Sequence, residues 1–64
     1  MDEALKKDIE RIKQIRTERS LTIRDVADKL GMAEQYLVMI ELGEIVPTEE
    51  ERELIEEYVI DSLS

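Results

Sequence analysis

Hydrophobic residues recur at helical spacing in four separate stretches of the chain. In the first stretch the inward positions are four, three and three residues apart, at Leu5, Ile9, Ile12 and Ile15. The later stretches repeat the pattern at Val26, Ala27 and Leu30, at Met32, Tyr36, Leu37 and Ile40, and at Leu54, Ile55, Tyr58, Val59 and Leu63. The pattern predicts an all-α, compact four-helix domain. We expect helices near residues 2–19, 22–30, 33–42 and 48–62, with no strand, in a single domain of residues 1–64.

Residues suited to starting and ending helices stand between these stretches. The Thr-x-x-acid pattern of a capping box occurs at residues 22–25 and again at residues 48–51. Gly31 and Gly43 can take the left-handed conformation that ends a helix and turns the chain. Two short helices joined this tightly match a helix-turn-helix unit. In the loop that follows, Ile45 and Val46 are expected to fold back onto the core.

An ordered set of short segments at fixed spacing runs from Ile12 to about Pro47. The segments are Ile12–Arg16, Leu21–Ala27, Leu30–Met32, Tyr36–Leu37 and Ile40–Gly43. Together they resemble the helix-turn-helix of the Cro/phage-repressor (XRE-type) family, which implies a lambda-repressor-like fold. The resemblance implies a transcriptional regulator that binds operator DNA, with the helix near residues 33–42 in the major groove. Ser20 takes the place of a glycine common in that family, so the turn before Leu21 is expected to be slightly strained.

The resemblance also implies roles for single residues. DNA contacts, if retained, are expected from Gln35, Glu34, Tyr36, Lys13, Arg19 and Arg24. Gln35 can read an adenine through its amide, and Glu34 can accept a hydrogen bond from a cytosine amino group although it repels phosphates. Arg16 and Glu41 are expected to form a structural ion pair that ties the first helix to the end of the third.

A second apolar stripe on the third helix favours a different function. Val38, Met39 and Leu42 occupy positions that face DNA in the family, and Ile23 stands where a polar phosphate contact is common. A contiguous exposed apolar patch suggests a partner surface. The alternative function is therefore a protein-interaction module, antirepressor-like or antitoxin-like, that binds a protein partner or forms a homodimer through the third helix. In the structural alternative, the third helix is rotated or the fourth helix covers the stripe.

The distribution of charge also opposes a simple DNA-binding role. The chain carries a formal net charge of −8. Residues 1–32 hold eight basic and seven acidic side chains, whereas residues 33–64 hold only Arg52 against ten acidic side chains. DNA-binding domains usually present a basic surface to the phosphates. The glutamates of the last stretch lie close together, and we expect this crowding of like charges to raise the pKa of some of them.

Several classes of function find no support in the sequence. Cysteine and histidine are absent, so the sequence predicts no disulfide, no thiolate site and no zinc cluster. No nucleophile–base pair or phosphate-binding loop is visible, so we expect no enzyme, no cofactor and no small-molecule ligand. No apolar run approaches the roughly 20 residues of a membrane span. The first residues lack the shape of a signal peptide, so a cytoplasmic location without a membrane partner is expected.

Overall fold

The computed structural model describes residues 3–61, which form four α-helices and no strand. The helices are α1 (Glu3–Glu18), α2 (Ile23–Leu30), α3 (Glu34–Glu41) and α4 (Glu49–Glu56), and α4 continues into a π-helical turn, η1 (Glu57–Asp61). The all-α fold class predicted from the spacing is confirmed. The predicted start at residue 2 and end at residue 62 lie outside the described residues. Three other helices begin one residue later than predicted, because residues 22, 33 and 48 are caps and not helical positions.

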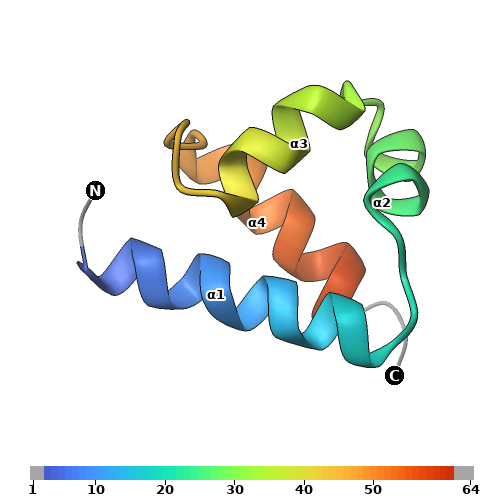
Figure 1. Ribbon diagram of the computed structural model, residues 1–64, viewed down its shortest axis with the longest axis horizontal. Coiled ribbons are helices and arrows are strands. Elements are labelled where there is room, and N and C mark those ends of the chain that lie inside the picture. Colours follow the sequence, from blue (N-terminus) through green and yellow to red (C-terminus); the bar gives the residue numbers. More distant parts are fainter. Residues whose placement is uncertain (1–2, 62–64) are drawn as a thin grey trace.

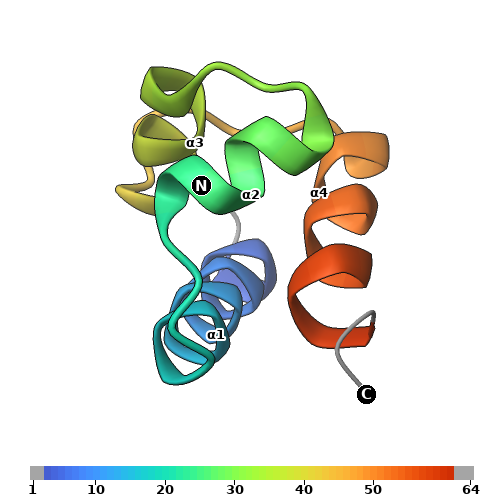
Figure 2. The same ribbon diagram turned by 90° about the vertical axis from the view of Figure 1, so that its right-hand side faces the viewer.

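The four helices enclose one small core (Figures 1 and 2). The helix α1 contacts α3 and η1, while α2 contacts α3 and α4. The most deeply buried side chains come from every helix and from η1; they are Ile12, Val26, Leu37, Ile40, Ile55 and Val59. Each of these is an inward position of the helical pattern, because burial of one apolar face is what holds short helices together.

Two capping boxes start α2 and α4, as the sequence predicts. Thr22 Oγ1 accepts a hydrogen bond from the Asp25 N–H at 3.0 Å, and Asp25 Oδ2 accepts one from the Thr22 N–H at 3.0 Å. Thr48 and Glu51 repeat this reciprocal arrangement at 3.1 and 2.9 Å. These bonds satisfy backbone N–H groups that have no partner inside the helix.

The helices α1, α2 and α3 all end in the same left-handed turn. The left-handed residues are Ser20 (φ 59°), Gly31 (φ 70°) and Gly43 (φ 80°). After each of them, the next N–H donates to the carbonyl five residues earlier, from Leu21 to Arg16, from Met32 to Ala27 and from Glu44 to Met39. This is the Schellman motif, which favours glycine at the left-handed position. Ser20 therefore carries the strain expected from the sequence.

The prediction of the last helix is wrong in one respect, because the observed helix is not a regular α-helix along its whole length. It changes to π-helical geometry at Glu57, and residues of η1 pack against α1. Arg19 Nη1 donates to the carbonyl oxygens of Val59 and Ile60 at 3.1 and 3.0 Å. Carbonyl groups near a helix end lack intrahelical partners, and this guanidinium supplies one. Arg19 thus fastens the end of α1 to η1.

Two apolar residues differ from the predicted core. Ile45 packs against the core as expected, but Val46 exposes 58% of its surface. Pro47 takes the buried place beside it instead. Leu54, which precedes the buried Ile55 on α4, exposes 43% of its surface. The predicted inward position Leu63 lies outside the described residues.

Replacing Ser20 with glycine should stabilise the protein. Glycine adopts φ near +60° without the steric cost of a Cβ atom, so the expected gain is about 1 kcal/mol in the free energy of unfolding. In a domain of this size that corresponds to a rise in melting temperature of about 4–8 °C. Thermal and urea denaturation measure both quantities.

Two further variants control this prediction. Ser20→Ala keeps the Cβ atom and should not reproduce the gain. Gly31→Ala should change stability in the opposite direction, because an added Cβ meets no atom within 4 Å and only the backbone strain at φ +70° remains. A gain in Ser20→Ala equal to that in Ser20→Gly would contradict the argument from strain.

Candidate interface on the helix-turn-helix

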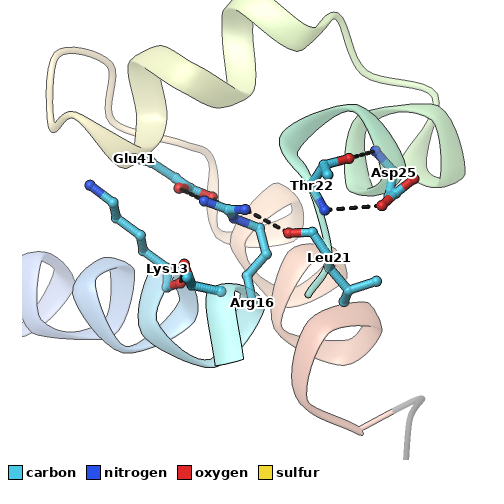
Figure 3. A network of polar contacts seen from close by, with 7 residues as sticks. Lys13, Arg16, Leu21, Thr22, Asp25 and Glu41 are labelled. Carbon is cyan, nitrogen blue, oxygen red and sulfur yellow. Dashed lines mark hydrogen bonds and ion pairs between the residues drawn. The ribbon is translucent and has the colours of Figure 1, made fainter. Parts of the chain in front are cut away.

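A largely buried ion pair holds the third helix against the first (Figure 3). Arg16 Nε and Nη2 donate to the two carboxylate oxygens of Glu41 at 2.8 and 2.9 Å. Arg16 Nη1 donates to the carbonyl oxygen of Leu21 at 2.6 Å. The side chains of Arg16 and Glu41 are only 12% and 6% exposed. One guanidinium therefore joins α1, the segment before α2 and the end of α3, and the bidentate geometry fixes their relative orientation.

A second polar contact joins α3 to α4. The Tyr36 hydroxyl donates to Glu51 Oε1 at 2.7 Å, the same oxygen that accepts the Thr48 N–H. The backbone N–H of Thr48 and, after it, the Tyr36 hydroxyl lower the pKa of Glu51 below its ordinary value. The hydrogen bond to the Glu51 carboxylate raises the pKa of Tyr36. The pKa of Glu51 therefore shifts in the direction opposite to the rise that was expected for some glutamates of the last helix.

The residues expected to contact DNA do not all lie on one surface. Gln35 and Glu34 are exposed at the start of α3, and Lys13 and Arg24 are exposed on α1 and α2. Tyr36 is half-buried, and its hydroxyl is bonded to Glu51 on α4. Arg19 is exposed as well, and one nitrogen of its guanidinium, Nη1, is bonded to the carbonyls of η1.

The exposed start of α3 has a mixed electrostatic character. No side chain caps it, because Ala33 has no oxygen to accept from the first N–H groups. Arg24 Nε lies 3.7 Å from Glu34 Oε1 and 3.9 Å from Asp28 Oδ2, and its side chain is 77% exposed. Such exposed pairs contribute little to stability. Their effect here is local, because the positive charge of Arg24 partly offsets the negative charge of Glu34 next to Gln35.

The apolar stripe predicted on α3 is present in altered form. Leu42 exposes 62% of its surface, so neither a rotation of α3 nor α4 covers it. Val38 and Ile23 are half-buried, and with Leu42 they line a shallow hollow whose rim includes Lys13 and the Arg16–Glu41 pair. Met39 is half-buried and lines neither this hollow nor its neighbour. The apolar surface therefore joins α2 to α3, with Met39 outside it.

A neighbouring hollow on the other side of Leu42 was not foreseen from the sequence. It lies between α1 and the end of α3 and is lined by Lys6, Ile9, Glu10, Glu41, Leu42 and Gly43. The spacing of residues 6, 10 and 13 places them along one side of α1, which is a signal present in the sequence. That this side borders Leu42 depends on how α1 packs against α3, which local spacing does not reveal.

Stability should fall in acid because two capping carboxylates have lowered pKa values. Hydrogen bonds from the backbone and hydroxyl of Thr22 lower the pKa of Asp25, as those from Thr48 and Tyr36 lower that of Glu51. A carboxyl group with a lowered folded pKa contributes stability above its unfolded pKa of about 4, and this is lost as pH falls through the folded pKa. The melting temperature should change little from pH 7 to about pH 5 and fall below about pH 4.

The matched variant for this prediction is Asp25→Asn with Glu51→Gln. It keeps acceptor oxygens but cannot ionise, so its melting temperature should depend less on pH in the acid range. A wild-type melting temperature that climbs between pH 5 and pH 3.5 would contradict the assignment.

No helix of the described residues is long and apolar enough to cross a bilayer, and no group of three or more acidic side chains there is placed to hold a metal ion.

Comparison with known proteins agrees with the helix-turn-helix geometry of this site. No curated protein and no solved structure shows a significant match to the sequence. A family model described as helix-turn-helix matches residues 12–58, which is more than half of the chain and includes all of α2, α3 and α4. The chain belongs to the Cro/C1-type (XRE) helix-turn-helix family.

Proposed function

We propose that the protein is a transcriptional regulator that binds duplex DNA by placing the start of α3 in the major groove. Membership of the helix-turn-helix family over residues 12–58, together with the exposure of Gln35 at the start of α3, is the observation that carries this proposal. The proposal needs neither a catalytic group nor a cofactor, and it places the protein in the cytoplasm with the DNA.

The exposed side chains have distinct roles in this proposal. Gln35 pairs with an adenine through its amide, and Glu34 accepts from a cytosine amino group. Lys13, near the end of α3, and Arg24, near its start, contact phosphates, while the uncapped N–H groups of α3 face the backbone of the duplex. With so few cations and a net charge of −8, non-specific affinity for DNA is low and its dependence on salt is shallow.

Docking of a protein is a second candidate function, favoured by one observation at the other end of α3. Leu42 exposes 62% of its surface above the hollow lined by Ile23 and Val38. Apolar side chains form no hydrogen bond or ion pair with phosphates, whereas they are typical anchors of protein interfaces. The two functions draw on different parts of α3, the start for DNA and the end for a protein.

Loss of the Gln35 amide should weaken DNA binding. The variant Gln35→Ala removes one base contact, so we expect binding to a duplex selected from a random pool to weaken by about 1–3 kcal/mol. Fluorescence anisotropy at about 50 mM salt measures the affinity. Gln14→Ala is the matched control, because Gln14 is exposed on α1 and its side-chain amide donates a hydrogen bond to Glu18 at 3.4 Å.

The charge of Glu34 provides a second test of DNA binding through α3. Glu34→Gln should strengthen binding to most duplexes, since it removes a charge that repels phosphates. A wild-type protein for which no duplex can be selected at low salt, or for which Gln35→Ala and Gln14→Ala have equal effects, would refute DNA binding through α3.

A further inference from the structure

A third hollow lies between the end of α2 and the junction of α4 with η1. It is lined by Lys29, Leu30, Leu54, Glu57 and Tyr58. Leu30, Leu54 and Tyr58 give it an apolar floor, and Leu54 is among the exposed large hydrophobic residues of the chain. In Figure 2, α3 lies on one side of α2 and α4 on the other. The hollow is therefore separate from the start of α3 and from the two hollows beside Leu42.

The exposed side of α4 is acidic everywhere except at Leu54. Its exposed residues, together with the first residue of η1, are Glu49, Glu50, Glu53, Leu54 and Glu57. Three of the glutamates are four residues apart, at 49, 53 and 57, so they form a row along the helix beside Leu54. Arg52 is the one basic residue of α4, and it is half-buried and paired with Glu56 at 3.1 Å. No cation of α4 therefore offsets the row.

The row and the hollow together define the chemistry of an occupant. The glutamates repel the phosphates of DNA and attract lysine or arginine, while the hollow favours an apolar side chain. A second copy of this chain does not fit, because it brings a net charge of −8. Its other exposed large hydrophobic residues, Leu42 and Val46, also stand close in sequence to glutamates. The occupant that complements this surface is apolar at one point and basic around it.

We infer that this hollow and the glutamate row form the docking site of a basic amphipathic helix from another protein. An apolar side chain of that helix enters between Leu30 and Leu54, and its basic side chains face Glu53 and Glu57. A helix matches the row because residues four apart on any α-helix advance by about 6 Å, so two helices laid side by side keep their charges in step. Docking of an amphipathic helix into an apolar groove is a general mode of recognition.

Lys29 gives the complex a direction. It is exposed on the α2 side of the hollow, opposite the glutamates of α4. Basic residues of the partner are therefore placed over α4, and the side of the partner that faces α2 is neutral or acidic. The inference goes beyond both candidate functions above and depends on neither, since it uses none of the residues assigned to DNA or to docking at Leu42.

Two synthetic peptides test the apolar and the charged part of the inference separately. The first has blocked ends, about 16 residues with alanine as background, lysines one turn apart in a row, and one central leucine beside that row. The second has serine in place of the leucine. Fluorescence anisotropy measures binding to the full chain in about 0.15 M salt. The leucine peptide should bind with a dissociation constant of about 10–100 µM, and the serine peptide about tenfold more weakly.

A substitution at Leu54 should remove the difference between the two peptides. Leu54→Asn should weaken binding of the leucine peptide by about tenfold and leave binding of the serine peptide unchanged, because only the apolar contact is lost. Val46→Asn is the matched control, since Val46 is more exposed than Leu54 but lies before α4 and does not line the hollow. Thermal denaturation shows whether each variant is folded. The comparison of the two peptides on the wild-type chain needs no variant.

Substitutions of charge test the row. Glu53→Gln with Glu57→Gln should weaken binding of both peptides by about tenfold and make binding less dependent on salt. Glu3→Gln with Glu10→Gln changes the net charge equally at exposed positions of α1, so it should have a much smaller effect. Lys29→Gln should strengthen binding, because it removes the cation beside the hollow.

Four results would overturn the inference. Equal affinity of the two peptides for the wild-type chain would show that the acidic side attracts cations without use of the hollow. No binding of the leucine peptide at a chain concentration of about 1 mM would exclude a basic helix as the occupant. Equal losses in the two glutamate pairs would assign the effect to net charge. Self-association that Leu54→Asn abolishes would assign the hollow to a second copy. No DNA is present, so each of these results leaves the DNA-binding proposal standing.

Discussion

The guanidinium of Arg16 is the point on which the arrangement of the helices depends. It donates twice to Glu41 and once to the carbonyl of Leu21, so α1, the segment before α2 and the end of α3 meet at one charged group. Both partners are largely removed from water. Because a buried charge without its partner is costly, the loss of either residue affects stability more than an exposed pair would. The direction in which α3 presents its outer side follows from this contact.

The two ends of α3 differ in chemistry because of that orientation. Its start carries exposed Glu34 and Gln35, with Arg24 close by, and has the polar groups that a base edge requires. Its end carries exposed Leu42 beside an apolar hollow, and these apolar side chains offer a phosphate neither a charge nor a hydrogen bond. Family membership supports the use of the start for DNA, and the apolar end supports an interface between proteins.

Local features of the fold were predictable from the sequence because they depend on residues close together in the chain. Both capping boxes follow from a Thr-x-x-acid pattern, and the turns at Gly31 and Gly43 follow from the freedom of glycine at positive φ. Even the strain at Ser20 follows from a side chain at a glycine position.

Contacts between distant segments were not predictable in this way. Arg19 bonds to carbonyls forty and forty-one residues later, and no local pattern distinguishes it from a free surface arginine. The bond from Tyr36 to Glu51 depends on how α3 and α4 meet, so the sequence alone left Tyr36 open as a DNA contact. Ile23 and Val38 share a hollow for the same reason, whereas Met39, adjacent in sequence, does not line it.

A double-mutant cycle on Arg16 and Glu41 tests most directly whether this pair organises the fold. Arg16→Met, Glu41→Leu and the double variant are compared by urea denaturation, in the Ser20→Gly background because this substitution is expected to add about 1 kcal/mol of stability. We predict that each single variant loses about 3–5 kcal/mol, because it leaves a buried charge unpaired, and that the double variant loses clearly less than the sum. Additive losses would contradict a direct coupling between the two residues and, with it, the role assigned here to Arg16.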